Sequence, residues 1–183
     1  MRLSEHKELK IEILALPQKD KDKLLLRLVA KDKVLTEHLH FVLLEGEEDL
    51  RNRVAQIKEE ITNTDKNLTT AKDVLANLRK LMKLINHFFK VTKSSFEEVE
   101  LRIFLLNHTA IEFKARSFSS YKNYEQLFGI FFVKSVAATL KKFEKLHEDL
   151  QFDLREDLNK LLIKTFTKNT ATIALDLGLP KQL

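Results

Sequence analysis

Cysteine is absent from this sequence of 183 residues, and glycine and proline are scarce, with three and two copies. A chain without cysteine has no disulfide, no thiolate nucleophile and no cysteine-ligated zinc or iron–sulfur centre. Glycine and proline supply most tight turns, so their scarcity favours long helices over hairpin-rich β structure. A disulfide-free chain is compatible with the cytosol, and we expect a cytoplasmic protein.

Long apolar runs are absent as well. The N-terminal segment MRLSEHKELKIEI is charged throughout and lacks the apolar stretch of a signal peptide. The most apolar window is LFGIFFVKSVAATL at 127–140, and Lys134 interrupts it. This window is shorter than the roughly 20 residues that cross a bilayer. We therefore expect no membrane span.

Sequence signatures of the common enzyme classes are also missing. The chain has no glycine-rich phosphate loop, no dinucleotide-binding fingerprint and no nucleophile elbow. We expect no cofactor, and the sequence favours a binding or scaffold protein over an enzyme.

Apolar residues at helical spacing are present along nearly the whole chain, whereas the alternation typical of β-strands is almost absent. Hydrophobic residues make up 44% and charged residues 32%, which fits one folded domain over residues 1–183. Short polar turns make neighbouring helices antiparallel. We predict an all-α fold of about six to eight helices, arranged as an antiparallel helical bundle or a short stack of helical hairpins.

Turn and capping residues predict some of the helix boundaries. The polar stretch TNTDKN at 62–67 predicts a turn between two helices. Ser95 and Glu98 have the spacing of a capping box, which predicts that a helix begins there. A helix that begins near Asn123 is expected to continue, straight or kinked, to about Thr165.

Three polar residues are candidates for a site in the core. Glu100 and Asn107 lie beside the apolar stripe of the predicted helix 96–113, and His147 lies on the edge of the apolar face of the helix 123–165. A buried carboxylate must be paired or protonated. Glu100 is therefore either a tuned acid in a polar pocket or half of a structural pair with a lysine, an arginine or His147.

The segment LHEDLQFD at 146–153 combines a histidine with three carboxylates. Lysines precede and follow these carboxylates at helical spacing, which is typical of a solvated helix face. A metal site is the alternative, because Glu37–His40 and Glu144–His147 have the Glu-x-x-His spacing of di-iron helical bundles. The two pairs do not converge on one side of the apolar stripes, so we predict no metal site.

Positive charge is concentrated between residues 66 and 95, which contain seven cations and one acid, whereas the whole chain has a net charge of +5. A single-sign stripe of this kind fits a nucleic-acid backbone or another polyanion, and it also fits a solvated face opposite acidic segments of the same fold. Four cations fall on one side of the predicted helix 69–91: Lys72, Arg79, Lys83 and Lys90. A second, shorter line contains Lys134, Lys141 and Lys145. Aromatic residues suited to stacking on bases lie in the 116–124 loop: Phe118, Tyr121 and Tyr124.

The segment LLLRLVAKDKVLTEHLHFVLLE at 24–45 resembles the N-terminal part of a family of small all-helical bacterial proteins without assigned function. EVELRIFLLNH at 98–108 and KKFEKLHEDLQFD at 141–153 resemble later segments of that family. The resemblance implies a bacterial, cytoplasmic helical protein, and it implies no activity or ligand.

Together these features predict a protein that works by binding. The leading hypothesis is a protein–protein adaptor or scaffold that presents helix faces to a partner. The alternative is a protein that binds nucleic acid or another polyanion through the basic stripe at 66–93. A helical metal- or small-ligand-binding protein that uses Glu100 and His147 is the third hypothesis. A homo-oligomer is compatible with each of them.

Overall fold

The structure is a computed structural model that describes residues 5–65, 68–113 and 123–183, with the backbone alone at 65, 168 and 169. The described residues form nine α-helices and no β-strand, which confirms the all-α class. The number of helices in the described residues exceeds the predicted six to eight, and the predicted helix 123–165 is divided in two. None of the described helices is long and apolar enough to cross a membrane.

The chain divides into two compact units, residues 1–44 and residues 45–183, and each is described by itself. The prediction of one domain over 1–183 stays a prediction. The N-terminal unit contains α1 (Lys7–Ala15), α2 (Gln18–Val29) and α3 (Lys33–Leu44). The α2 and α3 helices contact one another, and none of the three helices has a buried side chain.

The break between α2 and α3 lies at Asp32. Its carboxylate accepts a hydrogen bond of 3.1 Å from the backbone N–H of Leu35, so Asp32 caps the start of α3. The hydroxyl of Thr36 donates back across the break to the carbonyl of Val29 at 2.9 Å. These local contacts hold two short helices in place of one long helix.

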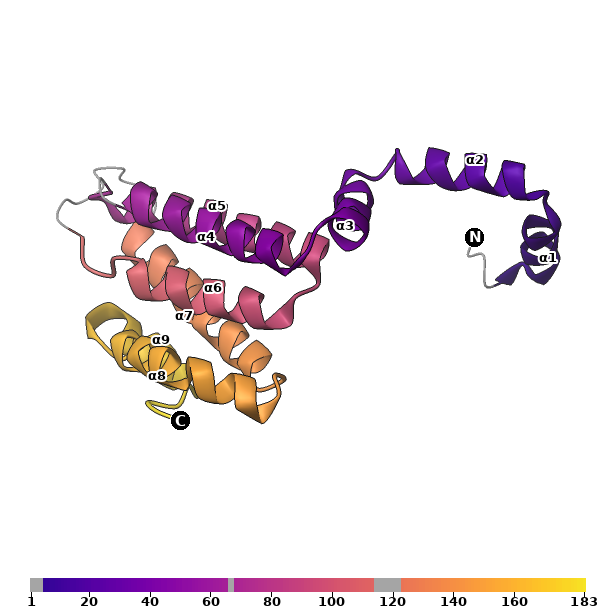
Figure 1. The fold of residues 1–183 in the computed structure, drawn as a ribbon. Coiled ribbons are helices and arrows are strands. Elements are labelled where there is room, and N and C mark those ends of the chain that lie inside the picture. The colour runs from indigo at the N-terminus through magenta and orange to yellow at the C-terminus, as the bar shows by residue number, and fades with distance from the viewer. Residues whose placement is uncertain (1–4, 66–67, 114–122) are drawn as a thin grey trace. The chain divides into compact units, whose positions relative to one another are not determined.

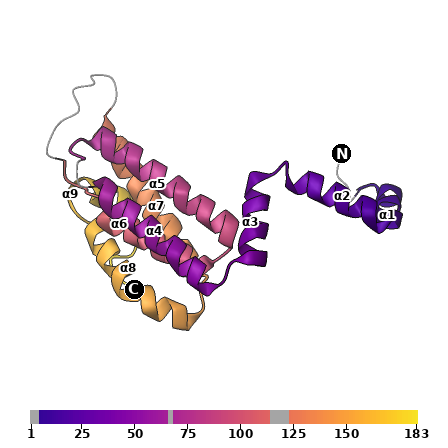
Figure 2. The same cartoon turned by 45° about the horizontal axis from the view of Figure 1, so that its top comes forward.

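The C-terminal unit is built from three consecutive helical hairpins. The first helices of the hairpins pack side by side, and so do the second helices, so the hairpins form two rows (Figures 1 and 2). The first row contains α4 (Glu47–Asp65), α6 (Ser95–His108) and α8 (Glu148–Thr165). The second row contains α5 (Ala71–Thr92), α7 (Tyr124–Phe143) and α9 (Lys168–Asp176).

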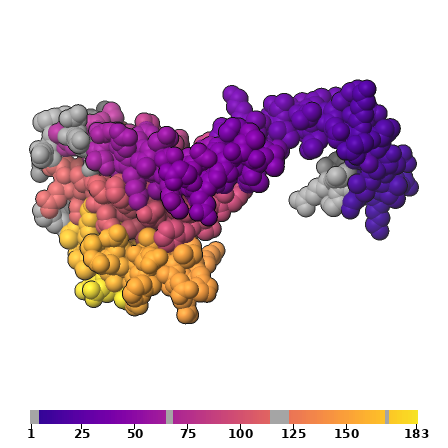
Figure 3. All heavy atoms as spheres, viewed as in Figure 1, coloured from indigo at the N-terminus to yellow at the C-terminus, as the bar shows by residue number. Residues whose placement is uncertain are grey.

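The core of this unit lies between the two rows, and α6 lies at its centre. The α6 helix packs against α4, α5, α7 and α8, and the space-filling view shows α8 directly against it (Figure 3). Side chains on both rows are fully buried there, among them Ile85, Val99, Leu106, Phe132 and Leu158. Burial of this apolar surface is the main force that holds the hairpins together.

The predicted turn at 62–67 begins later than its polar residues indicate. The α4 helix continues to Asp65, while 66–67 lie outside the described residues. Thr62 and Thr64 donate their hydroxyl hydrogen bonds to the carbonyls one helical turn back, at 2.9 and 2.5 Å. Threonine satisfied in this way is tolerated within a helix, so a polar stretch does not by itself end one.

The predicted helix 123–165 begins as expected and then breaks. The side chain of Asn123 accepts a hydrogen bond of 3.0 Å from the backbone N–H of Gln126 and caps α7. The α7 helix ends at Phe143 and α8 begins at Glu148. This turn contains no glycine or proline, and the packing of α8 beside α6 decides it. Within the 116–124 loop, Phe118 and Tyr121 lie outside the described residues.

The predicted capping box at Ser95 and Glu98 is wrong by one residue. Ser95 is the first helical residue of α6, and Ser94 occupies the capping position. The hydroxyl of Ser94 donates a hydrogen bond to the carboxylate of Glu97, which has the Ser-x-x-Glu spacing. Glu98 is therefore not part of the cap and lies in the core.

Candidate functional site

The predicted basic stripe lies on the exposed side of α5, where all four of its cations are exposed: Lys72, Arg79, Lys83 and Lys90. Two of them also pack across to α7. The ammonium of Lys72 lies 5.9 Å from the centre of the Tyr124 ring, and the guanidinium of Arg79 lies 5.2 Å from that of Phe131. Such cation–π contacts hold the side chains over the seam between the helices without neutralising their charge.

Acids elsewhere in the described fold do not neutralise this stripe. Lys80, on the neighbouring side of α5, forms a 2.9 Å ion pair with Glu60 of α4. Among the described residues no carboxylate lies within ion-pair distance of Lys83 or Lys90. Lys80 is therefore paired within the fold. For the four exposed stripe residues, the solvated face and the polyanion-binding surface both stay predictions.

The second line of cations lies on the neighbouring helix of the same row. Lys134 and Lys141 are exposed on α7, and Lys145 is exposed in the turn that follows. The sequence pattern showed two separate lines, and the packing of α5 against α7 brings them to adjacent helices.

Glu100 lies on α6 and forms an ion pair with Lys58 of α4, with 2.7 Å between Oε1 and Nζ. Both side chains are about 30% exposed, at 29% and 31%. This geometry is that of a structural pair with a lysine from a neighbouring helix, one of the two alternatives for Glu100. A binding role for Glu100 stays a prediction.

Asn107 lies on the same side of α6 as Glu100. Its side-chain amide donates a hydrogen bond of 2.9 Å to the backbone carbonyl of Asp157 on α8. Both residues line a surface hollow of about 400 Å³, together with Phe104 and Lys160. Hydrogen bonds to Glu156 and to Asp157 raise the pKa of Lys160, so its ammonium stays protonated and is paired with both carboxylates.

His147 does not join Glu100 and Asn107. The expectation that it lies on the edge of an apolar helix face is wrong, because the long helix breaks there and His147 becomes the N-terminal cap of α8. Its Nδ1 accepts a hydrogen bond of 3.4 Å from the backbone N–H of Asp149, and its side chain is 74% exposed. The acidic cluster that follows is exposed as predicted, including Glu148 and Asp153.

Metal coordination would need several ligands at one point. Within the part of the chain that the structure describes, no group of three or more histidine, aspartate or glutamate side chains is arranged to hold a metal ion. Glu144 and His147 lie in the turn between α7 and α8 instead of on one helix face.

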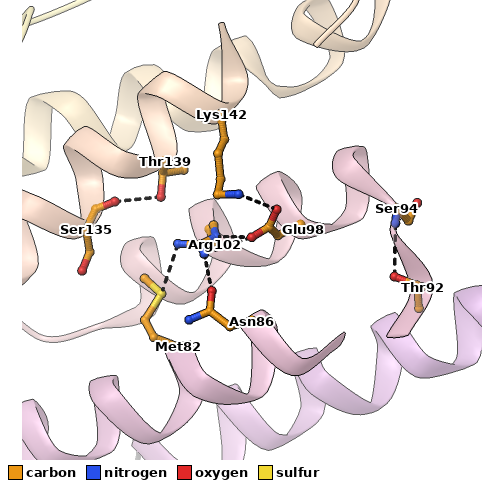
Figure 4. A network of polar contacts seen from close by, with 9 residues as sticks. All are labelled: Met82, Asn86, Thr92, Ser94, Glu98, Arg102, Ser135, Thr139 and Lys142. Carbon is orange, nitrogen blue, oxygen red and sulfur yellow. Dashed lines mark hydrogen bonds and ion pairs between the residues drawn. The ribbon is translucent and has the colours of Figure 1, made fainter. Parts of the chain in front are cut away.

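A buried ion-pair network between α5, α6 and α7 was not predicted (Figure 4). One carboxylate oxygen of Glu98 accepts a hydrogen bond of 3.0 Å from Nε of Arg102, and the other lies 2.9 Å from Nζ of Lys142. Arg102 also donates to the side-chain oxygen of Asn86, and its Nη1 lies 3.8 Å from Sδ of Met82. The side chain of Glu98 is 3% exposed and that of Arg102 is 9% exposed.

This network is structural in its geometry. Both oxygens of Glu98 lie against cations of the chain itself, and its side chain is 3% exposed, so the carboxylate is not accessible to a ligand. The one sequence signal was the spacing of four between Glu98 and Arg102, which is common on exposed helices. Nothing in that spacing distinguished a buried pair from a solvated one.

Comparison with protein families, with curated proteins and with solved structures found no match to this chain, so the functional argument rests on the geometry of its own residues.

Proposed function

We propose that this protein works by binding a protein partner, as an adaptor or scaffold without catalytic activity, and that its N-terminal unit supplies the partner-binding surface. The observation that carries this proposal is the burial within the N-terminal unit. The three helices of that unit bury no side chain, although they carry many large hydrophobic residues.

Eleven large hydrophobic side chains are exposed among the described residues of this unit: Leu9, Ile11, Leu14, Leu16, Leu25, Leu26, Leu28, Leu35, Val42, Leu43 and Leu44. Scattered exposed leucines are ordinary on a protein surface, but a density this high in about a quarter of the chain is not. A segment of this length with no core of its own gains too little from burial to offset the entropy lost on ordering. A partner with an apolar surface would supply the missing burial.

The C-terminal unit fits the role of a stable support. Its core lies entirely within residues 54–179, so it does not depend on the leucines of α1, α2 and α3. Stacked helical hairpins present extended surfaces, an architecture suited to scaffolds.

The test is capture of the partner from an extract of the source organism with the tagged full chain, after nuclease treatment. We compare the wild type with the double substitution Leu26→Asp and Leu43→Asp, two side chains that are 68% and 71% exposed. The expected result is a stoichiometric protein partner that the wild type retains and the double variant loses.

The matched control carries Ile163→Asp and Leu175→Asp, which change exposed hydrophobic residues of the C-terminal unit. This variant should retain the partner. Light scattering on the purified proteins identifies a second copy of the chain as the partner, if the wild type self-associates and the Leu26 and Leu43 variant does not. Equal retention by all three proteins, or no partner in any form, contradicts the proposal.

A further inference from the structure

The helices α5 and α7 together carry a net charge of +6, more than the +5 of the whole chain. The α5 helix contains five cations and one acid, and α7 contains three cations and one acid. Both acids, Asp73 and Glu125, lie in the first turn of their helix, where negative charge is favourable to the helix dipole. Beyond those first turns, neither helix contains an aspartate or a glutamate, and the remaining Lys and Arg residues are all cations.

Ion pairs with other described residues occupy two of these eight cations. Lys80 pairs with Glu60, and Lys142 pairs with Glu98. The six others are exposed: Lys72, Arg79, Lys83 and Lys90 on α5, and Lys134 and Lys141 on α7.

Three cation–π contacts show how α5 and α7 are aligned. Lys72 packs on Tyr124, Arg79 packs on Phe131, and Lys142 packs on Phe89. The partners differ in number by 52, 52 and 53, so the two helices run parallel in constant register. In this register Lys83 lies level with the residue after Lys134, and Lys90 lies level with the residue after Lys141.

The two rows of cations have dimensions that fit a nucleic-acid duplex. From Lys72 to Lys90 the row on α5 extends about 27 Å at 1.5 Å per residue. This is about eight base-pair steps along the axis of a duplex, over which phosphates of both strands in turn face a straight row. Packed helices lie about 8–10 Å apart, so long lysine side chains on both can reach phosphates on either side of a groove about 12 Å wide.

The side chains between the cations favour phosphate contacts over insertion into a membrane. The exposed positions between them on α5 and α7 include Ala76, Asn86 and Ala138, which are small or polar. Leu127, in the first turn of α7, is the one large hydrophobic side chain that is exposed on the described residues of these helices. Helices that bind in a lipid interface carry bulky apolar residues beside their cations.

Base stacking is also disfavoured on this surface. Tyr124, Phe131 and Phe89 are half-buried, and cations of the chain itself lie over all three rings. Recognition of single strands depends on free aromatic faces. Contacts to phosphates alone carry no sequence information.

We propose that the exposed cations of α5 and α7 form a binding surface for the phosphate backbone of duplex nucleic acid, with no preference for sequence. Six cations can neutralise up to six phosphates. This function goes beyond partner binding by the N-terminal unit and does not depend on it, because every residue involved belongs to the C-terminal unit.

The test is fluorescence anisotropy with a labelled DNA duplex of 24 base pairs at 50 and 200 mM KCl. The wild type should bind with a slope of log K against log salt between about −3 and −5, as expected for up to six phosphate contacts. A duplex of scrambled sequence should bind within threefold of the first. The triple variant Lys83→Glu, Lys90→Glu and Lys141→Glu should bind at least about tenfold more weakly at 50 mM salt, with a slope smaller by about three.

The matched control is the triple variant Lys19→Glu, Lys23→Glu and Lys31→Glu, which makes the same change in net charge at exposed positions of the N-terminal unit. It should bind the duplex within threefold of the wild type, and circular dichroism should show equal helix content in all three proteins. The proposal is overturned if the wild type does not bind at 50 mM salt, if both triple variants weaken binding equally, or if the α5–α7 variant binds as the wild type does. It is also overturned if the single strand, or vesicles containing phosphatidylserine, bind more than tenfold more tightly than the duplex.

Discussion

At the scale of single residues, burial decides what an ion pair does for stability. Glu98 and Glu100 are two positions apart on α6, and each pairs with a lysine from another helix. The carboxylate of Glu98 is almost fully buried with Arg102, whereas the pair of Glu100 with Lys58 is about 30% exposed on both sides. Loss of one partner from a buried pair leaves an uncompensated charge in the core, whereas water screens the exposed pair.

We expect Glu98→Ala to lower the free energy of unfolding by about 3 kcal/mol or more, because Arg102 and Lys142 then lose their buried counter-charge. Glu100→Ala is the matched control and should cost about 1 kcal/mol or less. Urea denaturation followed by circular dichroism measures both. Equal losses for the two variants would show that burial does not separate the two pairs.

At the scale of whole helices, side chains of neighbouring helices form hydrogen bonds with backbone groups at helix ends that have no partner within the helix. The last turn of α6 has carbonyls without helical partners, as every helix end does. The ammonium of Lys164 on α8 donates to three of them, at 3.1 Å to Leu106, 2.6 Å to Asn107 and 2.6 Å to Thr109. One side chain therefore ties the end of α6 to α8.

We expect Lys164→Met to lower the free energy of unfolding by about 2–3 kcal/mol. Carbonyls at the end of α6 lose a charged donor that water replaces only in part. Lys160→Met on the same helix is the control. Lys160 is exposed and pairs with Glu156 and Asp157 of its own helix. Its substitution should therefore lower the free energy of unfolding clearly less than that of Lys164. Thermal unfolding of both variants checks the order, and a larger loss for Lys160→Met would refute this role of Lys164.

At the scale of the whole molecule, the two units differ in how they are stabilised. All described buried residues lie in the C-terminal unit, and the helices of the N-terminal unit have none. Helices shorter than about 12–15 residues are marginal in water without tertiary packing. The α1, α2 and α3 helices contain 9, 12 and 12 residues and bury no side chain, so we expect them to be marginally stable in the free protein.

We expect amide hydrogen exchange in α1, α2 and α3 of the free protein to be fast, and exchange in α6 to be slow, because local opening of a helix without buried contacts costs little free energy. The partner captured by the N-terminal unit should then slow exchange in α1, α2 and α3 alone. Exchange measured by mass spectrometry on the full chain gives both rates. Slow exchange in these helices without a partner would contradict the marginal stability inferred for them.

The sequence by itself determined the all-α class, the exposed basic stripe and the exposure of the acidic cluster at 146–153. These features follow from local periodicity, because a residue's place around a helix is set by the backbone turn of about 100° per residue. Asn123 illustrates the same point for boundaries, since its capping hydrogen bond forms within one helical turn. Features that depend on a few neighbouring residues can be predicted from a single sequence.

Only the tertiary structure decided the break after Phe143, the burial of Glu98 and the partner of Glu100. Each depends on residues from distant helices: α8 packs beside α6, Lys142 reaches Glu98 from α7, and Lys58 reaches Glu100 from α4. The alignment of α5 with α7 that brings two lines of cations together is also of this kind. Helical spacing predicts which residues share a face of a helix. The packing of other helices decides whether the side chains on that face are buried, form ion pairs or are exposed to solvent.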